Sequence, residues 1–208
     1  MRNHFLRYRN TATRRWIATF AAITALSTPA FAHTNPGQAH GFVTGFLHPL
    51  SGLDHVLAMV AVGIWGAQLK RPAIWILPVA FPLVMSFGGL LGVRGVPLPG
   101  VEIGVAASGV VLGTVIALEL RPPLWVAALI VSAFAILHGH AHGTELPKAA
   151  SPLTYALGFV LATGLLHVSG ILIGLVDLLP AGNKLLRTAG GLITAAGLFL
   201  LVALVTHA

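Results

Sequence analysis

Histidine and acidic side chains gather in two short motifs within otherwise apolar stretches of this chain. The motifs contain His48, Asp54 and His55 in one case, and His138, His140, His142 and Glu145 in the other. Asp, Glu, Lys and Arg together make up only 8% of the residues. An Asp in the middle of a membrane helix costs on the order of 3 kcal/mol, so it normally has a partner and a function. Since imidazoles and carboxylates bind divalent transition metals, the sequence predicts a membrane protein that handles a metal ion.

The first motif places two imidazoles on one side of a helix. His48 and His55 are seven residues apart, so in a continuous helix they differ by about 20° and share a face. Pro49 and Gly52 weaken the helix between them, which can free backbone carbonyls to line a polar cavity. A structural role, in which Asp54 only neutralises His55, is the alternative. The density of ionisable groups favours the ligand role.

The second motif has the spacing of a metal-binding helix. His138 and His142 are four residues apart, which presents both imidazoles to one ion, and Glu145 remains near the same face. His140 points away from that face and is the weakest of the four candidates. A solvated stretch at a helix end is the alternative interpretation of this motif.

Four further residues are candidate ligands outside these motifs. If the chain is cleaved after Ala32, His33 offers an amine and an imidazole, and with His40 it forms a candidate external capture site for Ni²⁺ or Cu²⁺. An exposed tail without a ligand role explains these two residues equally well. Glu102 begins the third apolar segment, and His167 lies midway along the fifth.

The elements that must position these residues are membrane helices. The chain has 208 residues, of which 56% are hydrophobic, and its mean hydropathy is +0.89, which is far too apolar for a soluble domain. Short separators rich in Pro, Gly or charge divide six segments long enough to cross a bilayer. The segments are residues 41–69, 72–93, 101–120, 123–142, 152–179 and 185–206. We therefore expect an all-α, polytopic bundle of six transmembrane helices.

The N-terminal region has the pattern of a secretory signal peptide. Five of the twelve cations precede a short apolar stretch that ends in Ala30-Phe31-Ala32. Residues 1–32 are therefore predicted to be cleaved, which leaves residues 33–208 as a single permease domain. An uncleaved first membrane helix is the alternative, although the stretch is shorter than the ~20 residues that a span needs.

The charges between the segments indicate an orientation. Export places the mature N-terminus outside, so the first, third and fifth connections face the cytoplasm. Those connections carry five cations and the other two carry two, as expected for a bacterial inner-membrane protein. The cations are Lys70, Arg71, Arg121, Lys184 and Arg187 on one side, and Arg94 and Lys148 on the other.

Composition also excludes several classes of function. The chain has no cysteine, so thiolate metal sites and cysteine nucleophiles are ruled out. It has no Walker-type phosphate loop, which argues against ATP hydrolysis. Much of the positive charge belongs to the export signal, so nucleic acid is not expected as a partner.

With these residues in view, the chain resembles the HupE/UreJ family of nickel and cobalt permeases. The resemblance rests on His48-x5-Asp54-His55 and on the segment from Leu137 to Glu145, where Leu137 replaces the leading Phe of the family pattern. It implies uptake of Ni²⁺ or Co²⁺ as the transported ion, no tightly bound cofactor, and association with hydrogenase or urease maturation. The motif residues and Glu102 are then the functional set.

Three other functions use some of the same residues. A membrane metalloenzyme would bind substrate at an open coordination position, but no His-Glu-x-x-His motif supports it. A metal sensor or maturation partner would bind the ion without transporting it. An intramembrane hydrolase that pairs Ser108 or Ser169 with His167 leaves the carboxylates unexplained. Transport of the ion therefore remains the leading hypothesis.

Overall fold

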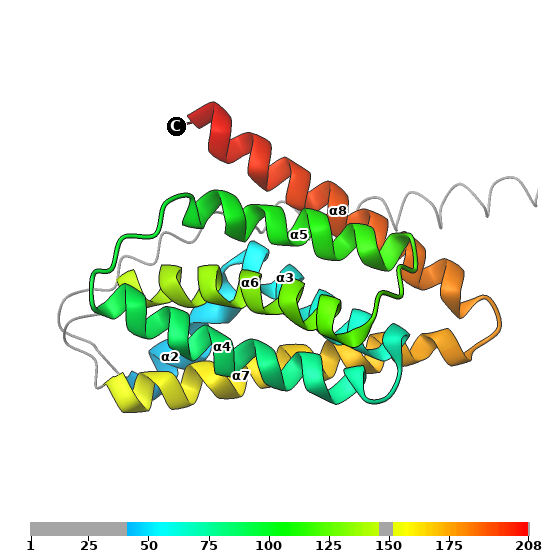
Figure 1. Cartoon of the computed structure of the whole chain (residues 1–208), viewed down its shortest axis with the longest axis horizontal. Helices are drawn as coiled ribbons and strands as arrows, with labels where there is room; N and C mark the ends of the chain where they lie inside the picture. Colours follow the sequence, from blue (N-terminus) through cyan, green and yellow to red (C-terminus); the bar gives the residue numbers. More distant parts are fainter. Residues whose placement is uncertain (1–40, 146–151, 208) are drawn as a thin grey trace, which may run out of the picture. The chain divides into compact units, whose positions relative to one another are not determined.

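The computed structural model describes residues 41–145 and 152–207, all of which belong to the second of two compact units, residues 36–208. The described residues form helices and no strand (Figure 1). The helices are α2 (Gly41–Ser51), α3 (Leu53–Leu69), α4 (Ala73–Val93), α5 (Val101–Ala117), α6 (Leu124–Thr144), α7 (Pro152–Gly174), the short 3-10 helix η1 (Leu175–Leu178) and α8 (Gly182–His207). The all-α prediction is confirmed for this part of the chain. The predicted signal peptide, residues 1–32, lies outside it.

The predicted apolar segments agree with these helices to within three residues, apart from the first, which is divided. Helices α4, α6, α7 with η1, and α8 are each long and apolar enough to cross a membrane, and the α2–α3 pair makes a fifth candidate. Helix α5 has only 17 residues and is shorter than each of these five candidate spans. Four or five of the six predicted spans therefore satisfy the length criterion in the described residues.

The first predicted segment is not one continuous helix. It bends by 81° between α2 and α3. Gly52, at the bend, has an extended backbone (φ −95°, ψ 118°), and Pro49 lies inside α2 and cannot donate a backbone hydrogen bond. The expectation that His48 and His55 share a face of one helix is therefore wrong, because the helix on which that periodicity depends is interrupted between them.

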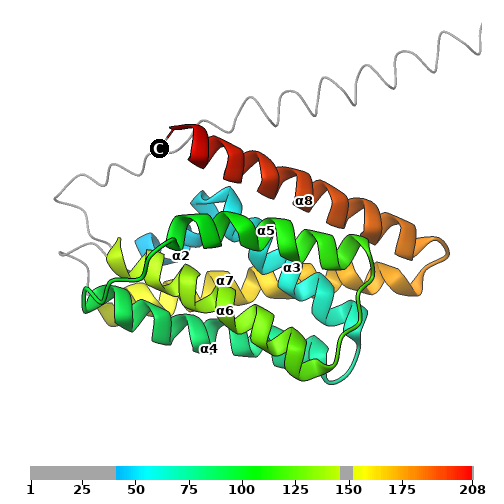
Figure 2. The ribbon, with the colours of Figure 1, turned by 45° about the horizontal axis from the view of Figure 1, so that its top comes forward.

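Helices pack in pairs that are distant in sequence (Figures 1 and 2). The most extensive contacts join α4 to α6, α5 to α8, and α7 to both α2 and α3. Between α4 and α6 the backbones approach so closely that a Cβ atom on Gly88, Gly139 or Gly143 would collide with the facing backbone. Small residues thus set the distance between the helix that carries the second motif and its neighbour.

Three side chains from neighbouring helices bind carbonyl groups at the end of the short helix α5 or just beyond it. Trp65 Nε1 donates to the carbonyl of Leu120 at 3.0 Å, and Gln68 Nε2 donates to Ile116 at 3.3 Å. Arg187 Nε donates to the carbonyl of Ala117 at 3.0 Å. Since the last carbonyls of a helix have no partner within it, the bonds to Ile116 and Ala117 help to satisfy the end of α5.

Candidate metal site

Four imidazoles from three helices meet at the end of the bundle where α6 ends and α7 begins. They are His48 of α2, His55 of α3, and His138 and His142 of α6. The ring centroid of His142 lies 4.7 Å from that of His48 and 4.3 Å from that of His55, and the centroid of His138 lies 4.9 Å from His55. With Asp54 and Glu145 these four residues are called the histidine cluster. The two predicted motifs are therefore brought together.

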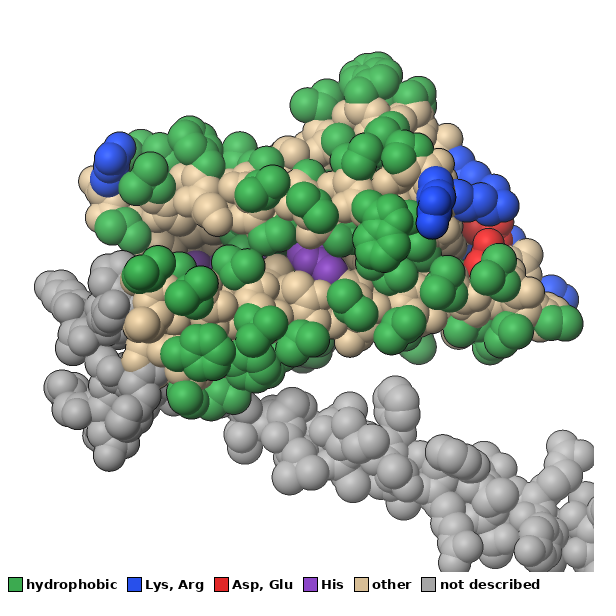
Figure 3. Space-filling model, turned by 90° about the horizontal axis from the view of Figure 1, so that it is seen from below, with side chains coloured by type: hydrophobic (Ala, Val, Ile, Leu, Met, Phe, Trp, Pro, Cys, Tyr) green, Lys and Arg blue, Asp and Glu red, His purple; other side chains and the backbone are tan. Residues whose placement is uncertain are grey.

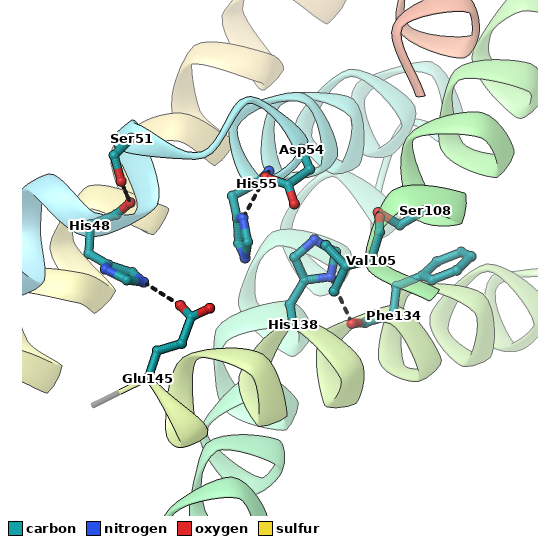
Figure 4. A network of polar contacts seen from close by, with 9 residues as sticks. All are labelled: His48, Ser51, Asp54, His55, Val105, Ser108, Phe134, His138 and Glu145. Carbon is teal, nitrogen blue, oxygen red and sulfur yellow. Dashed lines mark hydrogen bonds and ion pairs between the residues drawn. The ribbon is translucent and has the colours of Figure 1, made fainter. Parts of the chain in front are cut away.

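The outer edge of the histidine cluster is a group that can hold a metal ion. His48, His142 and Glu145 each offer a ligand atom, and these atoms lie within 4.8 Å of one another. His48 Nε2 lies 3.3 Å from Glu145 Oε2, a contact between α2 and the end of α6 that is drawn in Figure 4. Glu145 follows the last residue of α6 and is exposed, and its hydrogen bond from His48 lowers the pKa of its carboxyl group below the usual value. The carboxylate therefore remains charged and can offset the charge of a cation.

Deeper in the bundle, Asp54 orients His55. The Nδ1–H group of His55 donates to Asp54 Oδ1 at 2.8 Å, and the backbone N–H group of His55 donates to the same oxygen at 2.9 Å. Asp54 lies in the first turn of α3, where the helix dipole favours a negative charge. The bond to Nδ1 leaves Nε2 of His55 with a free lone pair, and Figure 4 shows this ring pointing from α3 toward α6. A carboxylate behind an imidazole is a common arrangement at metal sites.

His138 is oriented in the same way by the backbone of its own helix. Its Nδ1–H group donates to the carbonyl of Phe134 at 3.0 Å, so Nε2 carries the free lone pair. That Nε2 atom is buried and has no hydrogen-bond partner among the described residues, and neither nitrogen of His142 has one there. Buried polar atoms are normally satisfied. A cation among these imidazoles would satisfy them.

The remaining predicted ligands lie apart from the histidine cluster or outside the described residues. His140 Nε2 donates to the carbonyl of Val96 at 2.7 Å, in the connection between α4 and α5. Glu102 is exposed in the first turn of α5 and forms no ion pair with another described residue. His167 is buried on α7. His33 and His40 lie outside the described residues.

Aromatic residues that the sequence motifs did not identify surround the imidazoles. Phe159 and Tyr155 of α7 have ring centroids 4.4 Å from His142 and 6.0 Å from His48, respectively. Phe81 of α4 lies 5.6 Å from His138. Nothing in an apolar helix distinguishes such aromatics from lipid-facing ones, apart from the four-residue spacing of Tyr155 and Phe159.

An open cavity adjoins the histidine cluster. It has a volume of about 210 Å³ and lies between α4, α6 and α7, with His142, Tyr155 and Phe159 among its lining residues. Histidine side chains are visible within a hollow between hydrophobic ones in Figure 3. The histidine cluster is therefore partly accessible, although His138 and His142 are buried.

Comparison with known proteins identifies relatives over most of the chain. A family model described as HupE / UreJ protein matches residues 21–200. Protein HupE from Rhizobium leguminosarum bv. viciae is 45% identical over 181 residues, which cover 86% of this chain and 95% of that protein. No solved structure matches.

Proposed function

Since the chain belongs to the HupE/UreJ family, we propose that it is a permease that carries Ni²⁺ or Co²⁺ across the membrane through the histidine cluster. The observation that carries this proposal is the convergence of ligand atoms from separate helices: His48, His142 and Glu145 at the outer edge, with His55 and His138 behind them. Neutral imidazoles favour nickel and cobalt over magnesium and calcium, which prefer oxygen ligands.

The ion is bound first at the outer edge and then deeper in the bundle. A hydrated cation exchanges water for His48, His142 and Glu145, whose carboxylate reduces the net charge of the complex. His142 also contacts the ring of His55, so it can pass the ion to the free Nε2 atoms of His55 and His138. The buried position of those atoms removes water from the ion during this exchange.

The proposed membrane arrangement has six spans and an external N-terminus, in the inner membrane of a bacterium. The bent α2–α3 pair forms the first span, and α5 is the short third span. The histidine cluster then faces the outside, and the connections that carry Lys70, Arg71 and Arg121 face the cytoplasm, as the retention of cations inside favours. An inside-negative potential draws a cation inward by about 2.3 kcal/mol per charge per 100 mV. Residues 1–32 act as the cleaved export signal, and hydrogenase or urease maturation consumes the ion.

Uptake into liposomes tests the proposal. The full chain is reconstituted in vesicles that enclose a metal-sensitive dye, and Ni²⁺ or Co²⁺ is added outside with an inside-negative potential. We expect accumulation by the native protein and its loss in His142→Ala, because His142 contacts both parts of the histidine cluster. Thr206→Val is the control, since the hydroxyl of Thr206 bonds only within α8.

The other outcomes distinguish the alternatives. Metal binding by the native protein without accumulation contradicts transport and indicates a sensor or maturation partner. A chemical product from an added substrate indicates a metalloenzyme. Equal accumulation by native protein and His142→Ala contradicts the assignment of the histidine cluster as the route.

A further inference from the structure

Two polar side chains of α7 are buried without partners. His167 is 1% exposed and Thr163 is 0% exposed. Neither ring nitrogen of His167, nor the hydroxyl oxygen of Thr163, has a hydrogen-bond partner among the described residues. Burial of an unsatisfied polar group is unfavourable, and the surrounding helices are apolar, so these three atoms require a partner that the described residues do not provide.

Both side chains lie on one face of α7. They are four residues apart, and residues at this spacing are neighbours on a helix surface. The same helix packs against α3 at close range, because a Cβ atom on Gly63 would collide with the backbone of His167 and Gly170. The ring of His167 also lies 5.3 Å from that of Phe81 on α4. His167 is thus held in the interior, where α7 packs against α3 and α4, and the buried Thr163 lies one turn before it.

Phe81 contacts both His167 and the histidine cluster. Its ring is fully buried, and its centroid lies 5.6 Å from that of His138 and 5.3 Å from that of His167, both in T-shaped contacts. Pro78 and Pro82 flank Phe81 within α4 and remove two helix hydrogen bonds there, which lets the backbone adjust around the ring. The Phe81 ring therefore connects His138 to His167 through two aromatic contacts.

His167 lies farther from the outer edge than the histidine cluster does. It is roughly 22 Å along α7 from the first residue of that helix, at 1.5 Å per residue. His142, by contrast, is in the last turn of the antiparallel helix α6. His167 thus lies farther than His142 from the end that holds Glu145, and nearer the end that holds most cations.

We propose that His167 and Thr163 form an inner binding station for a partly hydrated divalent transition-metal ion, connected to the histidine cluster through Phe81. The imidazole supplies a nitrogen ligand, the hydroxyl supplies an oxygen contact, and water completes the coordination. This inference rests on the proposed function, since it gives the ion its next position after the histidine cluster. With two stations, the ion can cross the bundle in two steps. It leaves the histidine cluster first and is then bound by His167 and Thr163.

Uptake kinetics in proteoliposomes test the inner station. We expect His167→Gln to lower the maximal rate of Co²⁺ uptake by roughly tenfold, while the Co²⁺ concentration at half-maximal rate changes by less than about twofold. An outer-edge variant, His48→Ala, should instead raise that concentration. Thr163→Val keeps the shape of its side chain and should lower the maximal rate by a smaller factor. Ser169→Ala is the control on the same helix, because the exposed Ser169 hydroxyl bonds only to Leu165 of α7.

Equilibrium binding gives a second measurement that does not depend on transport. In lipid nanodiscs, the full chain should bind two Co²⁺ ions, and His167→Gln and Thr163→Val should each weaken or remove one of the two. The inner station would be overturned if native protein bound a single ion. It would also be overturned if the His167→Gln and Thr163→Val variants folded and transported like native protein. Native protein that takes up no metal at all would instead overturn the proposed function. If the His167→Gln variant does not fold, binding and uptake by the Thr163→Val variant test the inner station instead.

Discussion

At the scale of single residues, hydrogen bonds determine which nitrogen atom can bind metal. His55 donates from Nδ1 to Asp54, and His138 donates from Nδ1 to the carbonyl of Phe134. Because a neutral imidazole has one donor and one acceptor nitrogen, both rings are left with a lone pair on Nε2. The ligand atoms of two residues are therefore prepared before an ion arrives.

Removal of the charge on Asp54 tests this arrangement. In Asp54→Asn the amide occupies the same volume, but it no longer holds His55 in one tautomer and no longer offsets the cation. We expect the affinity for Co²⁺ to fall by about 10- to 100-fold, as measured by titration of the protein in nanodiscs. Asp177→Asn in η1, at the other end of the bundle, should leave the affinity unchanged. An equal loss in both variants would show that only net charge matters.

The sequence predicted part of the candidate site for a simple physical reason. Ionisable residues are expensive in apolar helices, so His138, His142 and Asp54 stand out against their surroundings. Phe81 does not stand out, because an aromatic ring fits equally well against lipid or a buried imidazole. Glu102 was grouped with the motifs through a family resemblance, and the structure places it exposed on α5 without an ionic partner among the described residues.

At the scale of elements, glycines hold α6 against α4 and so set the position of two imidazoles. A Cβ atom at Gly139 would collide with the backbone of Met85, and one at Gly143 with the backbone of Gly89. These glycines immediately follow His138 and His142 in the sequence. A change in the distance between the helices would therefore move the candidate ligands.

Gly139→Ala tests this packing. The added methyl group must separate α4 from α6, so we expect a loss of about 1–3 kcal/mol in the free energy of unfolding, together with weaker Co²⁺ binding. The matched control is Gly164→Ala on α7, where a Cβ atom would meet no other atom within 4 Å. That substitution should be neutral or slightly stabilising, because alanine favours a helix over glycine. Thermal unfolding in detergent compares the two variants, and equal stability would contradict the close contact.

The break between α2 and α3 shows where sequence periodicity reaches its limit. Pro49 and Gly52 correctly indicated a weak helix, but they do not determine the 81° angle. That angle depends on the packing of α2 and α3 against α7, which brings together residues more than a hundred positions apart. Local sequence therefore predicts that a helix can break, whereas tertiary contacts decide how far it bends.

At the scale of the whole helical unit, most Lys and Arg residues and the histidine cluster lie at opposite ends. Figure 3 shows Lys and Arg side chains gathered mainly at one end of the visible face. The connections between α3 and α4, between α5 and α6, and between α7 and α8 lie at the same end in Figures 1 and 2. Glu145 lies at the opposite end of the helical unit, directly after the last residue of α6. The helix boundaries could be predicted because Pro, Gly and charged residues interrupt the apolar segments at these turns.

Metal binding should depend on pH because most of the candidate ligands are imidazoles. A protonated imidazole cannot bind metal, so protons compete with Co²⁺ for the ring nitrogens and the affinity should fall as the pH is lowered from 8 to 5. Glu145 cannot cause that fall, because the hydrogen bond from His48 lowers its pKa and keeps it ionised across this range. Titrations at each pH should therefore give parallel curves for native protein and Glu145→Gln, with weaker binding by the variant throughout. An affinity that rises as the pH is lowered from 8 to 5 would contradict the assignment of imidazoles as ligands.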